Sequence, residues 1–109
     1  MAFALTDFEP CIRSHQHEWT AMSVEVRVNP ISPNYGKAIS TTEFESADWL
    51  ASVAAWETGE IELDAGRKAD VRGVSKHYDL NSSVQLDEVF AELVALLRDG
   101  TVPPDAVTW

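Results

Sequence analysis

The sequence predicts an α+β fold, in which an antiparallel β-sheet of about four to five strands has two α-helices packed on one face. Two observations lead to this prediction. Several short runs alternate apolar and polar residues, as strands with one buried face do, and a segment near the carboxyl end repeats its apolar residues at the helical period. The chain has 109 residues, of which 45% are hydrophobic. We therefore expect a single domain, residues 1–109, with one modest core.

Alternation of residue type predicts the strands. Between positions 22 and 28 every even-numbered residue is apolar, and Ser23, Glu25 and Arg27 lie between them. Apolar residues within the first twenty positions, among them Phe3 and Ile12, indicate one more strand there. The other expected strands cover residues 37–42, 60–65 and 71–80, each next to residues typical of turns.

The clearest predicted helix lies between Ser82 and Gly100. Ser82 and Gln85 form the pattern of a capping box, and Gly100 suits the position that follows a helix. The apolar residues are spaced i, i+3, i+4, i+7, i+8 and i+11, and they are Leu86, Val89, Phe90, Leu93, Val94 and Leu97.

A second helix is expected over residues 45–58. Trp49, Val53 and Trp56 are spaced i, i+4 and i+7, and Gly59 would end the helix. The predicted order of elements is therefore β-β-β-α-β-β-α, with both helices on one face of the sheet.

The charge of the chain excludes several kinds of partner. It has 8 Lys and Arg against 18 Asp and Glu, a formal net charge of −10, so nucleic acids and anionic membranes would repel it. No apolar run is long enough to span a membrane, and the first residues lack the cationic and apolar regions of a signal peptide. The single cysteine, Cys11, fits a reducing compartment, so we expect a cytoplasmic protein.

Candidate catalytic and metal-binding residues are few. If residues 15–17 are extended, His15 and His17 share one face, but nothing in the sequence brings His77 to them as a third ligand. Cys11 lacks the surroundings that a catalytic thiolate needs, and the five glycines form no phosphate-binding loop. We therefore expect no enzyme activity, no cofactor and no metal.

The acidic residues are unevenly distributed along the chain. Between Lys37 and Arg67 there is no basic residue. Such a segment is typical either of a solvated face or of a surface that binds a basic protein. The second interpretation makes Tyr35 and Trp109 candidate aromatic anchors. It also makes all seven acidic residues of the segment candidate partner-binding residues, namely Glu43, Glu45, Asp48, Glu57, Glu60, Glu62 and Asp64.

The segment from Trp49 through Trp56-Glu57-Thr58-Gly59 into Glu60-Ile61-Glu62-Leu63 resembles small bacterial immunity proteins of polymorphic-toxin systems. The likeness covers residues 22–98. It implies a compact, acidic α+β protein that blocks the basic active site of a toxin, and it assigns no residue roles because these proteins share none.

Three functions follow from these observations. The first is a non-catalytic inhibitor, an immunity protein whose acidic surface neutralises a basic toxin or nuclease domain. The alternative is an acidic nucleic-acid mimic of the phage type, which inhibits a DNA-binding protein or nuclease. The third is a metal or ligand binder that uses His15, His17 and His77.

Overall fold

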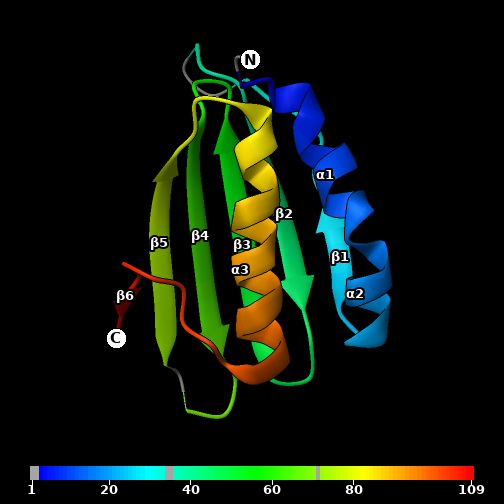
Figure 1. Ribbon diagram of the computed structural model, residues 1–109, viewed down its shortest axis with the longest axis vertical. Helices are drawn as coiled ribbons and strands as arrows, with labels where there is room; N and C mark the ends of the chain where they lie inside the picture. The colour runs from blue at the N-terminus through cyan, green and yellow to red at the C-terminus, as the bar shows by residue number, and fades with distance from the viewer. Residues whose placement is uncertain (1–2, 34–35, 71) are drawn as a thin grey trace.

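The computed structural model describes residues 3–33, 36–70 and 72–109 and arranges them as one β-sheet with helices on one side (Figure 1). Over these residues the sheet has six strands in the order β1-β2-β3-β4-β5-β6, each antiparallel to its neighbours. The elements, in chain order, are η1 (Leu5–Asp7), α1 (Phe8–Ser14), α2 (Gln16–Ala21), β1 (Glu25–Val28), β2 (Ile39–Glu45), β3 (Trp49–Trp56), β4 (Glu60–Arg67), β5 (Gly73–Asp79), η2 (Ser83–Gln85), α3 (Leu86–Asp99) and β6 (Val107–Thr108).

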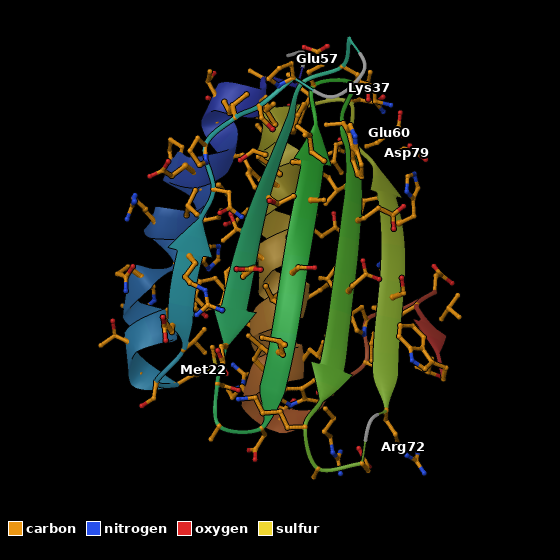
Figure 2. The ribbon with its side chains drawn as sticks, turned by 180° about the vertical axis from the view of Figure 1, so that it is seen from behind. Met22, Lys37, Glu57, Glu60, Arg72 and Asp79 are labelled. Atoms are coloured by element: carbon orange, nitrogen blue, oxygen red, sulfur yellow. The ribbon has the colours of Figure 1, made fainter. Side chains whose placement is uncertain are left out.

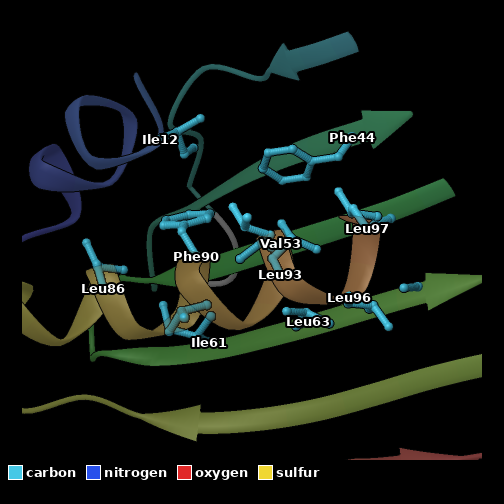
Figure 3. Close-up of a cluster of buried hydrophobic side chains, with 14 of the residues drawn as sticks. Ile12, Phe44, Val53, Ile61, Leu63, Leu86, Phe90, Leu93, Leu96 and Leu97 are labelled. Atoms are coloured by element: carbon cyan, nitrogen blue, oxygen red, sulfur yellow. The ribbon is translucent and has the colours of Figure 1, made fainter. Parts of the chain in front are cut away.

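The hydrophobic core lies between the sheet and the helices. Helix α3 packs along the middle of the sheet, where Phe90 and Leu93 are buried with Val53 of β3 (Figure 3). Helices α1 and α2 lie beside α3, and Trp19 of α2 packs on Phe44 of β2 with ring centroids 5.1 Å apart. All three helices thus cover the same face. None of the helices in the described residues lies on the opposite face of the sheet, which we call the open face.

The structure confirms the predicted C-terminal helix and explains its limits. Ser82 and Gln85 form the capping box, within the short turn η2 that precedes α3. Gly100 follows α3 with a φ of 78°, a left-handed conformation that glycine adopts without strain.

The expected helix over residues 45–58 is wrong, because this segment forms β3. Trp49, Val53 and Ala55 alternate with less buried residues, and β2 and β4 pair with the two edges of the strand. Gly59 lies in the β3–β4 turn instead of ending a helix. Its φ is 92°, and an added Cβ would lie 2.2 Å from the carbonyl oxygen of Leu80.

The strand expected in the first twenty residues is also wrong. Phe8, Ile12 and Trp19 are spaced at the helical period and are all buried on one side of α1 and α2. Pro10 is compatible with α1 because it lies in the first turn, where a backbone N–H has no partner within the helix. The helix axis breaks at His15, which ends α1 and precedes α2.

The broader fold prediction is confirmed: the chain is α+β, with an antiparallel sheet and helices on one face. The described residues contain six strands and three α-helices, against four to five and two expected. The segments expected as strands at 22–28, 37–42, 60–65 and 71–80 contain or overlap β1, β2, β4 and β5. Within the described residues, no helix has the length and apolar character needed to cross a membrane.

Candidate functional site

The open face is built around β3, which runs through the middle of the sheet (Figure 2). Residues on β3 alternate between the core and the open face, so every second side chain points outward. These outward residues are uncharged, and we call them the neutral column: Leu50, Ser52, Ala54 and Trp56.

Acidic residues flank the neutral column on both sides. In the register of the sheet, Glu43 of β2 lies opposite Ser52 of β3, and Ser52 lies opposite Asp64 of β4. Directly opposite residues point to the same face, so these side chains form one row across the open face. The structure brings together five of the seven acidic residues predicted from the sequence, namely Glu43, Glu45, Glu60, Glu62 and Asp64.

The remaining predicted partner-binding residues lie elsewhere. Asp48 is in the β2–β3 turn and Glu57 is in the β3–β4 turn, at opposite ends of the sheet. Tyr35 lies outside the described residues. Trp109 follows β6, and the residue is 65% exposed. The open face gains two carboxylates that the sequence reasoning missed, Glu25 of β1 and Asp79 of β5, because their strands pair beside Glu45 and Glu60.

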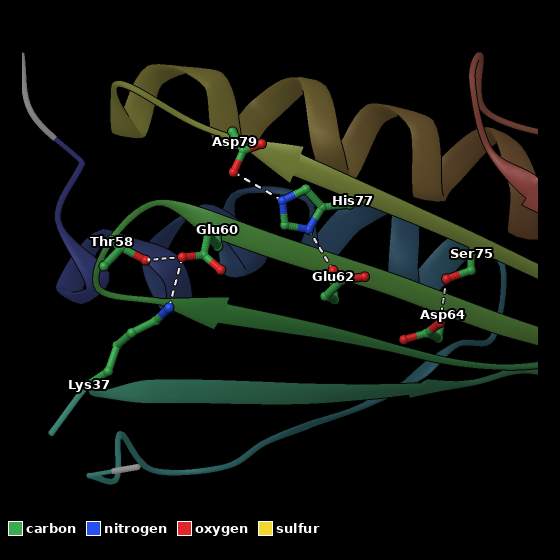
Figure 4. A network of polar contacts seen from close by, with 8 residues as sticks. All are labelled: Lys37, Thr58, Glu60, Glu62, Asp64, Ser75, His77 and Asp79. Carbon is green, nitrogen blue, oxygen red and sulfur yellow. Dashed lines mark hydrogen bonds and ion pairs between the residues drawn. The ribbon is translucent and has the colours of Figure 1, made fainter. Parts of the chain in front are cut away.

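Ion pairs neutralise part of this acidic surface. Arg27 of β1 lies 3.0 Å from a carboxylate oxygen of Glu25 and 3.3 Å from one of Glu43. Lys37 Nζ lies 2.7 Å from Glu60 Oε1 (Figure 4). Asp64 differs, because it accepts a hydrogen bond from the Ser75 hydroxyl at 2.7 Å and contacts no cationic side chain in the described part of the chain.

The protonation of the open face follows from these contacts. A hydrogen bond from Lys68 lowers the pKa of Glu45, and one from Lys37 lowers the pKa of Glu60, so both carboxylates stay ionised at neutral pH. His77 forms hydrogen bonds with Glu62 and Asp79, and both bonds raise its pKa. The bond with Glu62 has the larger effect. The imidazolium form of His77 is therefore the form that this surface favours.

A shallow depression lies at one end of the open face, with a volume of about 550 Å³. Trp109 forms one side of it and lies directly over Gly73, with which it exchanges two backbone hydrogen bonds of 3.1 Å. The residues that line the depression include Arg27, Glu43, Glu45, Leu50, Ser52, Asp64, Gly66 and Trp109.

The three histidines considered as metal ligands do not meet. His77 lies on the open face, His17 is an exposed residue of α2, and His15 lies at the junction of α1 and α2. Residues Gln16–Ala21 form α2, so the condition under which His15 and His17 would share one face of an extended segment is not met. His15 is instead close to Cys11 and Asp87, and the helical i, i+4 spacing of Cys11 and His15 is the sequence signal that was missed.

The chain was compared with models of protein families, with curated proteins and with solved structures. None of the three comparisons found a match. The roles considered for the open face therefore come from its own geometry and charge, and no role is taken over from a relative.

Proposed function

We propose that this chain is a non-catalytic protein-binding inhibitor, and specifically an immunity protein that neutralises a basic bacterial toxin domain through the open face. The observation that supports this most is the arrangement of the face itself. A sheet surface without helices carries acidic residues on both sides of an uncharged strip, and Trp109 stands exposed at one end. Interfaces between proteins combine such a central strip with a charged surround.

The charge of the open face favours a basic partner. Its seven outward carboxylates exceed the three Lys and Arg side chains paired with them by four when His77 is neutral and by three when His77 is protonated. An excess of one sign on one face speeds the encounter with a surface of the opposite sign and slows the encounter with like-charged surfaces. The seven carboxylates are Glu25, Glu43, Glu45, Glu60, Glu62, Asp64 and Asp79.

The depression provides a place for a basic side chain of the partner. Asp64 has no cation of its own within the described chain, and Trp109 offers an aromatic face on the rim. A lysine or arginine lying here would place its aliphatic stem against Leu50, which is 50% exposed. Its charged end would meet Asp64, and a ring beside it adds a cation–π contact.

Two double variants with the same change in net charge test this proposal. Glu43→Lys with Asp64→Lys reverses two charges on the open face, whereas Asp48→Lys with Glu57→Lys reverses two charges in the turns. The tagged wild-type chain is used to capture proteins from its native lysate at low salt. The captured protein is identified by mass spectrometry, and its binding to each purified variant is then measured at low and high salt.

We expect the wild-type chain to capture a basic protein and to bind it in a one-to-one complex. The association rate of this complex should fall about 10-fold or more in the open-face variant and little in the turn variant. Expressed alone, that protein should harm cells, and co-expression of the chain should prevent the harm. Equal binding of both variants, or binding that salt does not weaken, would contradict the proposal. Competition by duplex DNA for the captured protein, without toxicity, would favour the nucleic-acid mimic instead.

A further inference from the structure

A compact group of potential metal ligands lies away from the open face, where α1 meets the start of α3. Cys11, His15 and Asp87 each offer one ligand atom, and these atoms all lie within 4.8 Å of one another. Cys11 and His15 are four residues apart, so α1 presents both on the same side. Asp87 comes from the first turn of α3, and its carboxylate oxygen Oδ1 lies 2.8 Å from His15 Nε2.

A fourth residue fixes the imidazole of His15. This residue is Glu18, whose Oε1 lies 2.6 Å from His15 Nδ1. The His15 side chain is only 12% exposed. Metal-bound histidines commonly donate their second ring N–H to a carboxylate, which orients the ring and makes the other nitrogen a better ligand. Glu18 takes this position here. His15 Nε2 is then the nitrogen that points to the other two ligands.

The chemistry of the group selects the metal. A thiol, an imidazole and a carboxylate are the ligands that zinc uses in proteins, whereas Ca²⁺ and Mg²⁺ prefer oxygen ligands alone. The Asp87 side chain is 73% exposed, so an ion can reach the site and the carboxylate can move to its coordination distance.

We propose that Cys11, His15 and Asp87 bind one Zn²⁺ ion, with a water molecule as the fourth ligand and Glu18 holding the His15 ring. Binding forms the sulfur–zinc bond and releases the thiol proton of Cys11 to solvent, and the proton that His15 Nε2 shares with Asp87 leaves as that nitrogen binds the ion. The ion connects α1 to α3, two helices that are far apart in the sequence and meet on the same face of the sheet. It thereby stabilises the N-terminal helices, and this role is independent of the partner bound at the open face.

The test uses the full chain without a purification tag, so that no other histidines are added. Zn²⁺ binding is measured by calorimetry, and Co²⁺ replaces zinc to reveal a thiolate–metal bond by its absorption. Cys11→Ser and Glu18→Gln probe a ligand and the residue that orients His15. His17→Ala is the control, because His17 is 80% exposed on α2 and approaches the group only through Glu18 Oε1, from which its Nε2 lies 3.9 Å away.

We expect one Zn²⁺ per chain, a thiolate–cobalt absorption band, and a higher melting temperature with zinc. Cys11→Ser should remove the band and weaken zinc binding more than about 10-fold, and Glu18→Gln should weaken it about 10- to 100-fold. His17→Ala should bind as the wild type does. In the wild type, zinc should also protect Cys11 from alkylation, and a chelator should reverse this protection. The proposal is wrong if Cys11 reacts equally fast with and without zinc, or if His17→Ala weakens binding as much as Cys11→Ser.

Discussion

The contact between Trp109 and Gly73 leads to a prediction about the end of the sheet beside the depression. A Cβ at position 73 would lie 2.0 Å from the indole atom Cε2, so Gly73→Ala forces the ring of Trp109 away. Displacement of the ring breaks the two hydrogen bonds between these residues, worth about 2 kcal/mol together. It also exposes the buried third of the indole, about 80 Å² or about 2 kcal/mol. Releasing Trp109 returns about 2 kcal/mol of conformational entropy, so the net loss is about 2 kcal/mol.

Hydrogen exchange is the assay for this prediction, because Gly73 N–H and Trp109 N–H are the donors of the two hydrogen bonds. Both amides should lose their protection in Gly73→Ala, while the free energy of unfolding by urea falls by only about 2 kcal/mol. Gly66→Ala is the matched control, because Gly66 lies opposite Gly73 in the sheet and its added Cβ would meet no atom within 4 Å. In a Trp109→Ala background, Gly73→Ala should cost nothing more. The reasoning fails if both amides stay protected in Gly73→Ala or if Gly66→Ala costs as much.

Two further predictions concern stability. The Thr42 hydroxyl is buried without a hydrogen-bond partner in the described chain, so Thr42→Val should raise the free energy of unfolding in urea by about 1 kcal/mol. Thr41→Val should not, because the Thr41 hydroxyl accepts a hydrogen bond, and a destabilised Thr42→Val would refute this account. Glu62 and Asp79 raise the pKa of His77 above 6.5, so protonated His77 stabilises the fold at low pH, and this contribution disappears as pH rises through the raised pKa. The difference in the free energy of unfolding between wild type and His77→Gln should therefore decrease from about pH 5 to about pH 9. A difference that stays constant with pH would contradict this role of His77.

The segment 45–58 illustrates which part of the fold could be predicted from sequence. Trp49, Val53 and Trp56 satisfy helical spacing, but the same segment also alternates, and its inward residues are Trp49, Ala51, Val53 and Ala55. Two periods therefore fit one short apolar run, and the spacing alone does not choose between them. Pairing with β2 and β4 stabilises the strand. This pairing depends on residues outside the segment, so the sequence of the segment alone does not predict it.

The candidate site was predictable in composition but not in arrangement. The sequence identifies the acidic segment, and within the strand expected over residues 60–65 Glu62 and Asp64 alternate with the buried Ile61 and Leu63. Whether Glu43 lies beside them depends on the register of two hairpins, which puts Ser52 between Glu43 and Asp64. The acidic residues of the turns, such as Glu57, look the same in sequence and lie outside the face.

The order of the strands has a consequence for how the chain folds. From β1 to β5, every strand pairs with the next strand along the chain, so each pairing closes a short loop at a low entropic cost. The N-terminal helices differ, because they reach the C-terminal part of the chain only through distant contacts, such as the packing of the Phe8 ring of α1 on Phe90 of α3 at 5.8 Å. We expect the hairpins to form early and the docking of α1 and α2 on α3 to complete folding, which buries the aromatic cluster around Phe90 last.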